Sequence, residues 1–170
     1  MMVTAAMDAL PPPAGFVRLA ASLRLHNDPD RVAALLREGS VPWPPARDVA
    51  PDGSELRRFA VDLRLRVGGE KVAFSTFGKA AFLDLGAPRR TAHGWEAEIS
   101  WLASTAAPLF PVFSGWLTIG REELRIDGLY APPGGVVGRV ADRMLLHVAA
   151  NATARWVLDE IDRFARGAAV

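Results

Sequence analysis

Hydrophobic and polar residues alternate with a period of two over most of residues 16–130. This alternation is typical of half-buried strands, in which every second side chain faces a core. It predicts about seven strands, joined mostly by short turns, over residues 17–25, 58–67, 72–76, 81–85, 95–101, 113–119 and 124–130. Short turns favour antiparallel pairing, so we expect a mainly antiparallel sheet with one face on a core and the other in water.

One short helix is predicted between the first two strands. Asn27 or Asp28 can cap its N-terminus, Pro29 suits its first turn, and Gly39 ends it. Residues 40–54 hold four prolines and predict an irregular loop. Long loops of this kind are often functional, and whether this one closes over a site stays open.

The period changes to 3.6 after Pro132 and Pro133, which predicts a long helix over residues 136–166. Its apolar stripe runs through Val137, Ala141, Met144, Leu145, Val148, Ala152, Ala154, Val157, Leu158, Ile161 and Ala165. Such a helix is about 45 Å long and needs a partner along most of its length. The apolar face of the sheet is the partner we expect.

The composition fits one globular domain. The chain has 170 residues, half of them hydrophobic, and no cysteine. We expect a disordered lead-in over residues 1–15, a single domain over 16–166 and a short tail over 167–170. The lead-in lacks the basic and apolar regions of a signal peptide, so we expect a cytoplasmic location.

The formal net charge of +1 gives no general attraction to nucleic acid or to an anionic membrane. Eighteen of the twenty basic residues are Arg, and they are scattered along the sequence. We therefore expect no nucleic-acid partner and no membrane insertion. Six charged strand residues are expected to pair across the water-facing side of the sheet: Arg58, Arg64, Glu96, Glu98, Arg125 and Asp127.

A strand, a short helix, six further strands and a long C-terminal helix is the element order of the helix-grip fold. In this order the chain resembles the START-like (SRPBCC) superfamily, which includes pollen allergens of the Bet v class, polyketide cyclases and lipid-transfer START domains. The resemblance is greatest over Leu124–Gly134 (LRIDGLYAPPG), followed by Gly138, Asp142 and the helix through Phe164. The family commonly has two short helices after its first strand, whereas this chain shows only one.

The resemblance implies a cavity between the curved sheet and the last helix that holds an apolar or aromatic ligand. Aromatic residues on successive strands are candidates to line it, and ordinary core packing is the alternative. The candidate ligand-binding residues are Phe74, Trp95, Trp101, Phe113 and Trp116 from the strands, Met144, His147 and Val148 from the helix, and Trp43, which we expect to cover the mouth.

Candidate catalytic residues are few. The three histidines, His26, His93 and His147, lack the spacing of metal ligands. His147 can direct polar atoms into the expected cavity, and Tyr130 is the other candidate. The carboxylates Asp159, Glu160 and Asp162 are expected to be exposed near the helix end. We expect no metal and no cofactor.

Three functions are compatible with these features. The first is a noncatalytic carrier or sensor of a hydrophobic small molecule such as a lipid or a polyketide. The second is an enzyme of the polyketide cyclase or dehydratase type. The third is an interaction module, with a homodimer formed through sheet edges or the long helix.

Overall fold

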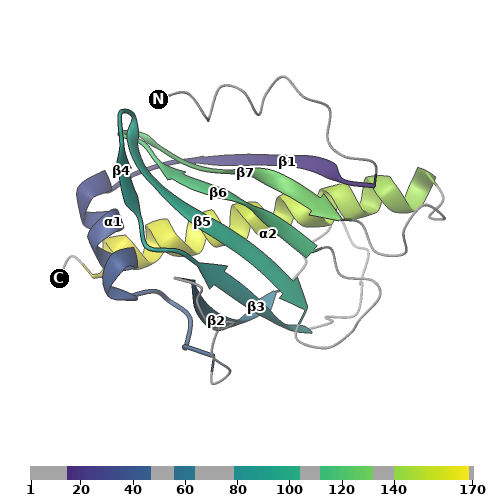
Figure 1. The fold of residues 1–170 in the computed structure, drawn as a ribbon, viewed down its shortest axis with the longest axis horizontal. Coiled ribbons are helices and arrows are strands. Elements are labelled where there is room, and N and C mark those ends of the chain that lie inside the picture. Colours follow the sequence, from purple (N-terminus) through teal and green to yellow (C-terminus); the bar gives the residue numbers. More distant parts are fainter. Residues whose placement is uncertain (1–14, 47–55, 64–78, 104–111, 132–139, 169–170) are drawn as a thin grey trace.

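The structure is a computed structural model that describes residues 15–46, 56–63, 79–103, 112–131 and 140–168. Seven strands form one antiparallel sheet in the order β1-β7-β6-β5-β3-β2, and β4 pairs with β5 (Figure 1). The strands are β1 (Val17–Arg24), β2 (Arg57–Leu63), β3 (Lys79–Leu85), β4 (Arg89–Thr91), β5 (Gly94–Ala103), β6 (Val112–Ile119) and β7 (Glu123–Ala131). The prediction of a mainly antiparallel sheet is confirmed.

The strands differ from the predicted set in one place. β4 was not predicted, because three residues are too few to show an alternating pattern. It returns into β5 through a turn at Gly94, whose φ of 137° is favourable only for glycine. The predicted strand over residues 72–76 lies outside the described residues.

The short helix has the predicted ends. α1 (Pro29–Glu38) is capped by Asp28, whose side chain accepts a hydrogen bond from the backbone N–H of Asp30. Gly39 ends the helix in the left-handed conformation, with φ of 79°. Its apolar side, formed by Val32, Ala33 and Leu36, is buried.

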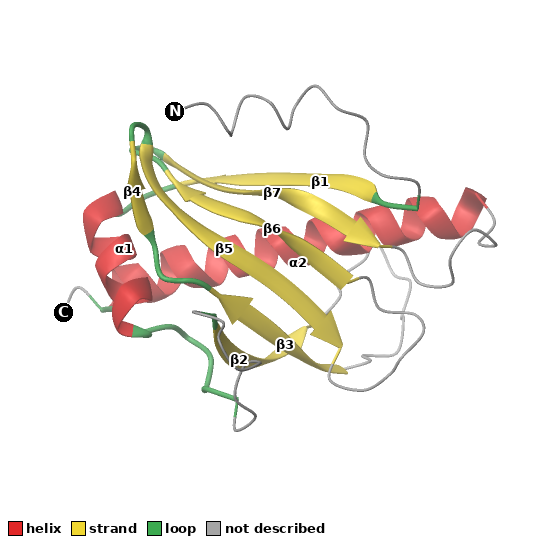
Figure 2. Cartoon of the chain, in the orientation of Figure 1, coloured by secondary structure: helices red, strands yellow, loops and turns green. Residues whose placement is uncertain are grey.

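The long helix, α2 (Val140–Gly167), crosses one face of the sheet and packs against β1, β7 and α1 (Figures 1 and 2). Its side chains Ala154, Val157, Leu158 and Ile161 are almost completely buried. We call the face of the sheet toward α2 the inner face and the opposite one the outer face. An antiparallel sheet gripping a long C-terminal helix is the expected helix-grip architecture.

Two glycines let an aromatic ring lie close to the inner face. Gly115 of β6 and Gly128 of β7 are direct cross-strand neighbours. A Cβ at Gly115 would lie 2.3 Å from the carbonyl oxygen of Asp127, and one at Gly128 would lie 2.4 Å from that of Ser114. The ring of Phe113 occupies the adjacent space, 2.7 Å from the first of these positions. A side chain at either position would collide with the backbone of the neighbouring strand and force the two strands apart.

A buried carboxylate joins the C-terminal half of α2 to the end of β1. Asp162 is 1% exposed and accepts hydrogen bonds from the backbone N–H of His26 (3.1 Å) and from Asn27 Nδ2 (3.0 Å). Its second oxygen lies 3.2 Å from His26 Nδ1 and 3.2 Å from a nitrogen of Arg166. The expectation that Asp162 is exposed was wrong, because it lies on the helix side that carries Leu158 and Ala165.

Charged side chains of the outer face pair partly as expected. Arg58 binds Asp84, its cross-strand neighbour, through two hydrogen bonds of 2.7 and 2.8 Å. Asp127 accepts from Arg125 at 2.7 Å and from Arg18 at 3.5 Å. No helix in the part of the chain that the structure describes is long and apolar enough to cross a membrane.

Candidate functional site

Three aromatic side chains form a continuous row on the inner face. Trp101 of β5, Phe113 of β6 and Tyr130 of β7 are cross-strand neighbours in the sheet register, and all are almost completely buried. Trp101 and Phe113 stack with ring centroids 3.9 Å apart and planes 17° from parallel. Trp101 and Phe113 were predicted among the ligand-binding residues and Tyr130 as a catalytic candidate, and all three positions share the inward side of their strands.

The row ends in a polar pair that reaches α2. The Oη atom of Tyr130 lies 3.3 Å from Nδ1 of His147, and Nε2 of His147 lies 3.0 Å from Nδ2 of Asn151. The sequence named His147 and Tyr130 as the candidates for proton chemistry, and the structure brings them into contact. His147 is exposed and Tyr130 is buried, so the pair connects the inner face with the surface.

Each ring nitrogen of His147 contacts a polar side chain. The amide nitrogen of Asn151, next to Nε2, also donates to the backbone carbonyl of His147 at 3.0 Å. Which ring nitrogen carries the proton sets the direction of the hydrogen bond between Nδ1 and Oη of Tyr130. Burial raises the pKa of Tyr130, so this hydroxyl stays protonated in neutral solution.

Two indole donors are buried without an acceptor in the part of the chain that the structure describes. The indole nitrogens of Trp101 and Trp43 are inaccessible to solvent and have no hydrogen-bond partner among the described residues. Buried polar groups are normally paired, and an unpaired N–H costs about 1 to 3 kcal/mol. Trp101 therefore places an unpaired donor in the same aromatic row as the hydroxyl of Tyr130.

Trp43 lies in the core, so the expectation that it covers a cavity mouth was wrong. Its ring contacts Phe59 and Trp156, at centroid distances of 6.5 and 6.0 Å. The start of the proline-rich loop pairs with β2, since the N–H of Ala60 donates to the carbonyl of Pro44. This pairing directs Trp43 toward α2.

Two other predicted aromatic residues lie away from the row. Trp95 is at the α1 end of β5, where its Nε1 donates to Asp30 at 2.8 Å and its ring contacts the guanidinium groups of Arg37 and Arg90. Trp116 is 44% exposed on the outer face. Its assignment to an inner site was wrong. Trp116 is three residues from Phe113 along β6, so the two side chains point to opposite faces of the sheet.

Three predicted ligand-binding residues are not placed by the structure. Phe74 lies outside the described residues. Met144 and Val148 belong to α2, but their side chains are also outside the description.

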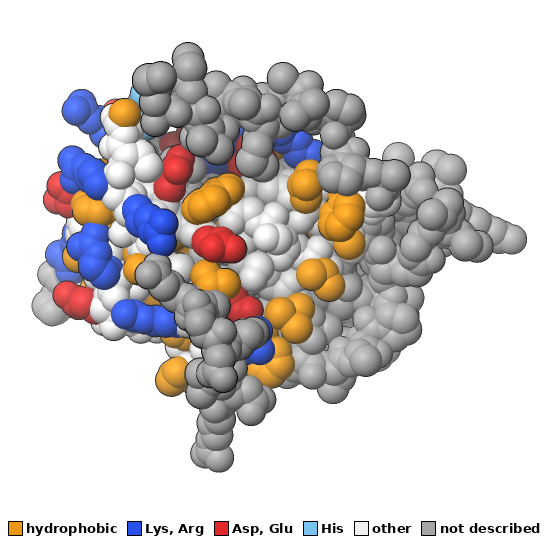
Figure 3. Space-filling model, viewed as in Figure 1, with side chains coloured by type: hydrophobic (Ala, Val, Ile, Leu, Met, Phe, Trp, Pro, Cys, Tyr) orange, Lys and Arg blue, Asp and Glu red, His pale blue; other side chains and the backbone are white. Residues whose placement is uncertain are grey.

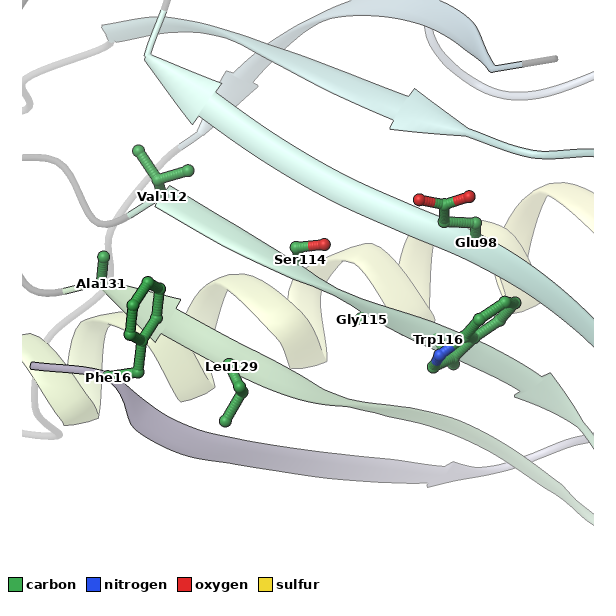
Figure 4. A pocket seen from close by; sticks show the side chains of 8 residues that line it. All are labelled: Phe16, Glu98, Val112, Ser114, Gly115, Trp116, Leu129 and Ala131. Atoms are coloured by element: carbon green, nitrogen blue, oxygen red, sulfur yellow. The ribbon is translucent and has the colours of Figure 1, made fainter. Parts of the chain in front are cut away.

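The described residues also line a hollow of about 400 Å³ on the outer face (Figure 4). This hollow was not predicted, because the outer face was expected to be uniformly polar. The available signal was a set of apolar residues at outward strand positions. The residues that line the hollow are Phe16, Glu98, Val112, Ser114, Gly115, Trp116, Leu129 and Ala131.

The two remaining histidines, His26 and His93, take part in contacts that hold local structure together. His26 is bound to Asp162, and His93 lies in the turn between β4 and β5, where its backbone N–H donates to Thr91 Oγ1 at 3.3 Å. Among the residues that the structure describes, no three His, Asp or Glu side chains cluster as metal ligands would.

Comparisons with known proteins give only distant structural likenesses. No family model matches the sequence, and no curated protein matches it. The fold is similar to DynU16, a putative protein in the dynemicin biosynthetic locus, with 16% identity and a TM-score of 0.38. The match covers 91% of this chain and 47% of DynU16, so the chain spans about half of that protein's length. It is also similar to the Zhui aromatase/cyclase from Streptomyces sp. R1128, with 13% identity, a TM-score of 0.38 and 90% of each chain covered. Likenesses this distant assign no activity to the chain.

Proposed function

We propose that this protein binds an apolar, planar small molecule with a hydrogen-bond-accepting oxygen between the inner face of the sheet and α2. The observation that carries the proposal is the buried indole N–H of Trp101, which has no acceptor among the described residues. A ligand oxygen would satisfy it and recover the free energy of an unpaired donor. A lipid or a polyketide carries such oxygens.

The neighbouring residues suit the same class of ligand. The rings of Trp101 and Phe113 stack on each other and give the indole N–H apolar, aromatic surroundings. The hydroxyl of Tyr130, in contact with His147, is a second polar group at the other end of the row. Ligand sites usually combine an apolar lining with a few directed polar groups, and this row has that composition.

The first experiment is native mass spectrometry of the purified protein, followed by calorimetric titration with a matched pair of probes. The pair is 2-acetylnaphthalene, which carries a carbonyl oxygen, and 2-isopropylnaphthalene, which has the same shape without an acceptor. We expect the ketone to bind at least about tenfold more tightly, because the analogue leaves the buried donor unpaired. Equal affinity for the two probes would contradict the proposal.

Trp101→Phe removes the N–H and keeps an aromatic ring. We expect this variant to lose the preference for the ketone, while Trp43→Phe, the same change at the other unpaired indole, keeps it. Thermal unfolding of both variants without ligand checks that each one folds. A preference that survives in Trp101→Phe would show that this indole does not contact the ligand oxygen.

The second candidate function is proton-transfer catalysis on a ligand bound in the same place, and the Tyr130–His147 contact favours it. In this arrangement the protonated phenol would donate to a substrate oxygen while its contact with Nδ1 of His147 holds the phenol in place. Tyr130→Phe should abolish turnover of an aromatic polyketide substrate and change probe affinity by no more than about tenfold. Unchanged turnover in this variant would exclude catalysis by this pair.

A further inference from the structure

The outer face is apolar over its middle and basic toward α1 and β4. Figure 3 shows hydrophobic side chains gathered over the middle of this face, while basic side chains lie toward α1 and β4. Phe16, Val112 and Trp116 are the large hydrophobic residues that the structure describes as exposed, at 46%, 52% and 44%. All three line the same hollow. The exposed large apolar side chains of the described residues therefore gather at one place on the outer face.

The hollow has an apolar end and an acidic end. Phe16, Val112 and Ala131 lie together at one end, and Glu98 and Trp116 lie at the other (Figure 4). Its floor is Ser114 and the backbone of Gly115, where small residues leave room between the larger ones. The long dimension follows β6, from Val112 to Trp116, which is about 13 Å at the usual rise per residue.

Glu98 provides the charge of this end. It is exposed and lies directly across from Trp116 in the β5–β6 register. Within the described residues its carboxylate makes no ion pair or hydrogen bond. The nearest other carboxylate in the register is Asp127, opposite Trp116 on β7, and it is already bound to Arg18 and Arg125. Glu98 is therefore the carboxylate available to a ligand.

We propose that this outer hollow is a second binding site, specific for an organic cation with an apolar tail. Its ammonium group binds between the Glu98 carboxylate and the face of Trp116, and its tail lies along Ser114 toward Phe16 and Val112. A carboxylate and an indole ring both attract a cation, the first by its charge and the second by its quadrupole. The site is separate from the proposed inner site, because its lining side chains point to the opposite side of the sheet.

The test is calorimetric titration with 4-phenylbutylammonium and with the uncharged 4-phenylbutan-1-ol, which has the same tail. We expect the ammonium compound to bind saturably, with one equivalent per chain. We expect the alcohol to bind at least about twofold more weakly, because it lacks the charge that Glu98 and Trp116 attract. Ser114→Phe should abolish binding of both probes, since the ring would occupy the floor of the hollow. Equal affinity for the two probes would overturn the proposal.

A matched pair of carboxylate variants locates the charge. Glu98→Gln should weaken ammonium binding about two- to fivefold and leave the alcohol unchanged. Glu96→Gln is the control: it changes the same residue type on the same face of β5, but opposite Arg89 and outside the hollow. Equal losses in the two variants would mean that the general surface charge, and not this site, attracts the cation.

Two measurements distinguish this site from the inner site and from a dimer interface. Trp101→Phe should leave ammonium binding unchanged, so failure of the proposed inner site does not affect this result. Light scattering of the wild-type protein and of Trp116→Glu tests whether a second copy covers the hollow. A dimer that Trp116→Glu converts to a monomer would overturn the ligand proposal and identify the hollow as an interface.

Discussion

The residues that most constrain the sheet are two that have no side chain. Gly115 and Gly128 face each other across β6 and β7, and the ring of Phe113 lies against them. The alternation along residues 113–119 and 124–130 puts both positions on the inward side, but alternation alone does not explain why they are glycine. The reason is that the backbones of β6 and β7 and the ring of Phe113 lie very close together at these positions. This packing depends on contacts between strands, so it cannot be predicted from the sequence of one strand.

Gly128→Ala should therefore destabilise the protein by about 1 to 3 kcal/mol or more, because the new methyl group would meet backbone on the neighbouring strand. Gly167→Ala is the control, since nothing lies within 4 Å of a Cβ at that position. Urea denaturation of both variants measures the difference. If Gly128→Ala were as stable as Gly167→Ala, the close packing of Phe113 on the glycine pair would be wrong.

Single residues also mark the limits of prediction from the sequence. Alternation along β6 already separates Trp116 from Phe113, so the misplacement of Trp116 came from selecting residues by aromatic type. Asp162 could have been found by helical spacing, because it follows Leu158 by four residues. The contact between Tyr130 and His147 required the structure, since helix rotation relative to the sheet is a tertiary property.

At the scale of elements, α2 is attached to the turn between β1 and α1 by the buried Asp162. Burial in this place opposes the charged form, yet hydrogen bonds from His26 and Asn27 and the charge of Arg166 outweigh it, so the pKa of Asp162 is lowered. A carboxylate with a lowered pKa in the folded state stabilises the fold above its unfolded pKa of about 3.9. That contribution is lost as the pH falls through the lower, folded pKa.

Asp162→Asn should consequently reduce stability at pH 7 by about 1.5 to 3 kcal/mol, and the difference from wild type should shrink as the pH falls below about 4. Asp159→Asn, in an exposed ion pair with Arg163 on the same helix, should have little effect. Chemical denaturation at several pH values measures both. A difference that stays constant down to about pH 2 would show that the charge of Asp162 is not involved.

The end of α1 was predicted to the residue at Gly39 and its cap to one of two residues, Asn27 or Asp28, while the bounds of the strands were less exact. Asp28, Pro29 and Gly39 are specific signals of a helix start and end. β4 has only three residues, and its existence depends on pairing with the longer β5. Short edge elements of this kind are set by their neighbours.

At the scale of the whole molecule, one core lies between the inner face and α2. The order of strands and helices could be predicted from the change of period along the chain, and the partner of the long helix followed from its apolar stripe. The hollow on the outer face was not predictable in the same way. Val112 and Leu129 are apolar residues at outward positions of different strands, and they line one hollow only because β6 and β7 pair.

Leu158→Ala tests whether the sheet and α2 form one cooperative unit. Leu158 is completely buried, so its truncation should cost about 2 to 5 kcal/mol. Far-ultraviolet circular dichroism and tryptophan fluorescence should report the same shifted unfolding transition. A loss below about 0.5 kcal/mol, or two separate transitions, would mean that α2 does not hold the sheet together.

The position of β1 at the sheet edge has a consequence for how the chain is made. Among the described strands β1 pairs with β7 alone, and Arg18 and Asp127 on these strands are 109 residues apart. During synthesis β1 leaves the ribosome long before its partner exists, and its inward side stays uncovered until α2 follows. Contacts between such distant residues slow folding and expose nascent chains to aggregation. A ribosome-bound fragment that stops before β7 should therefore recruit chaperones through β1, while the finished chain should not.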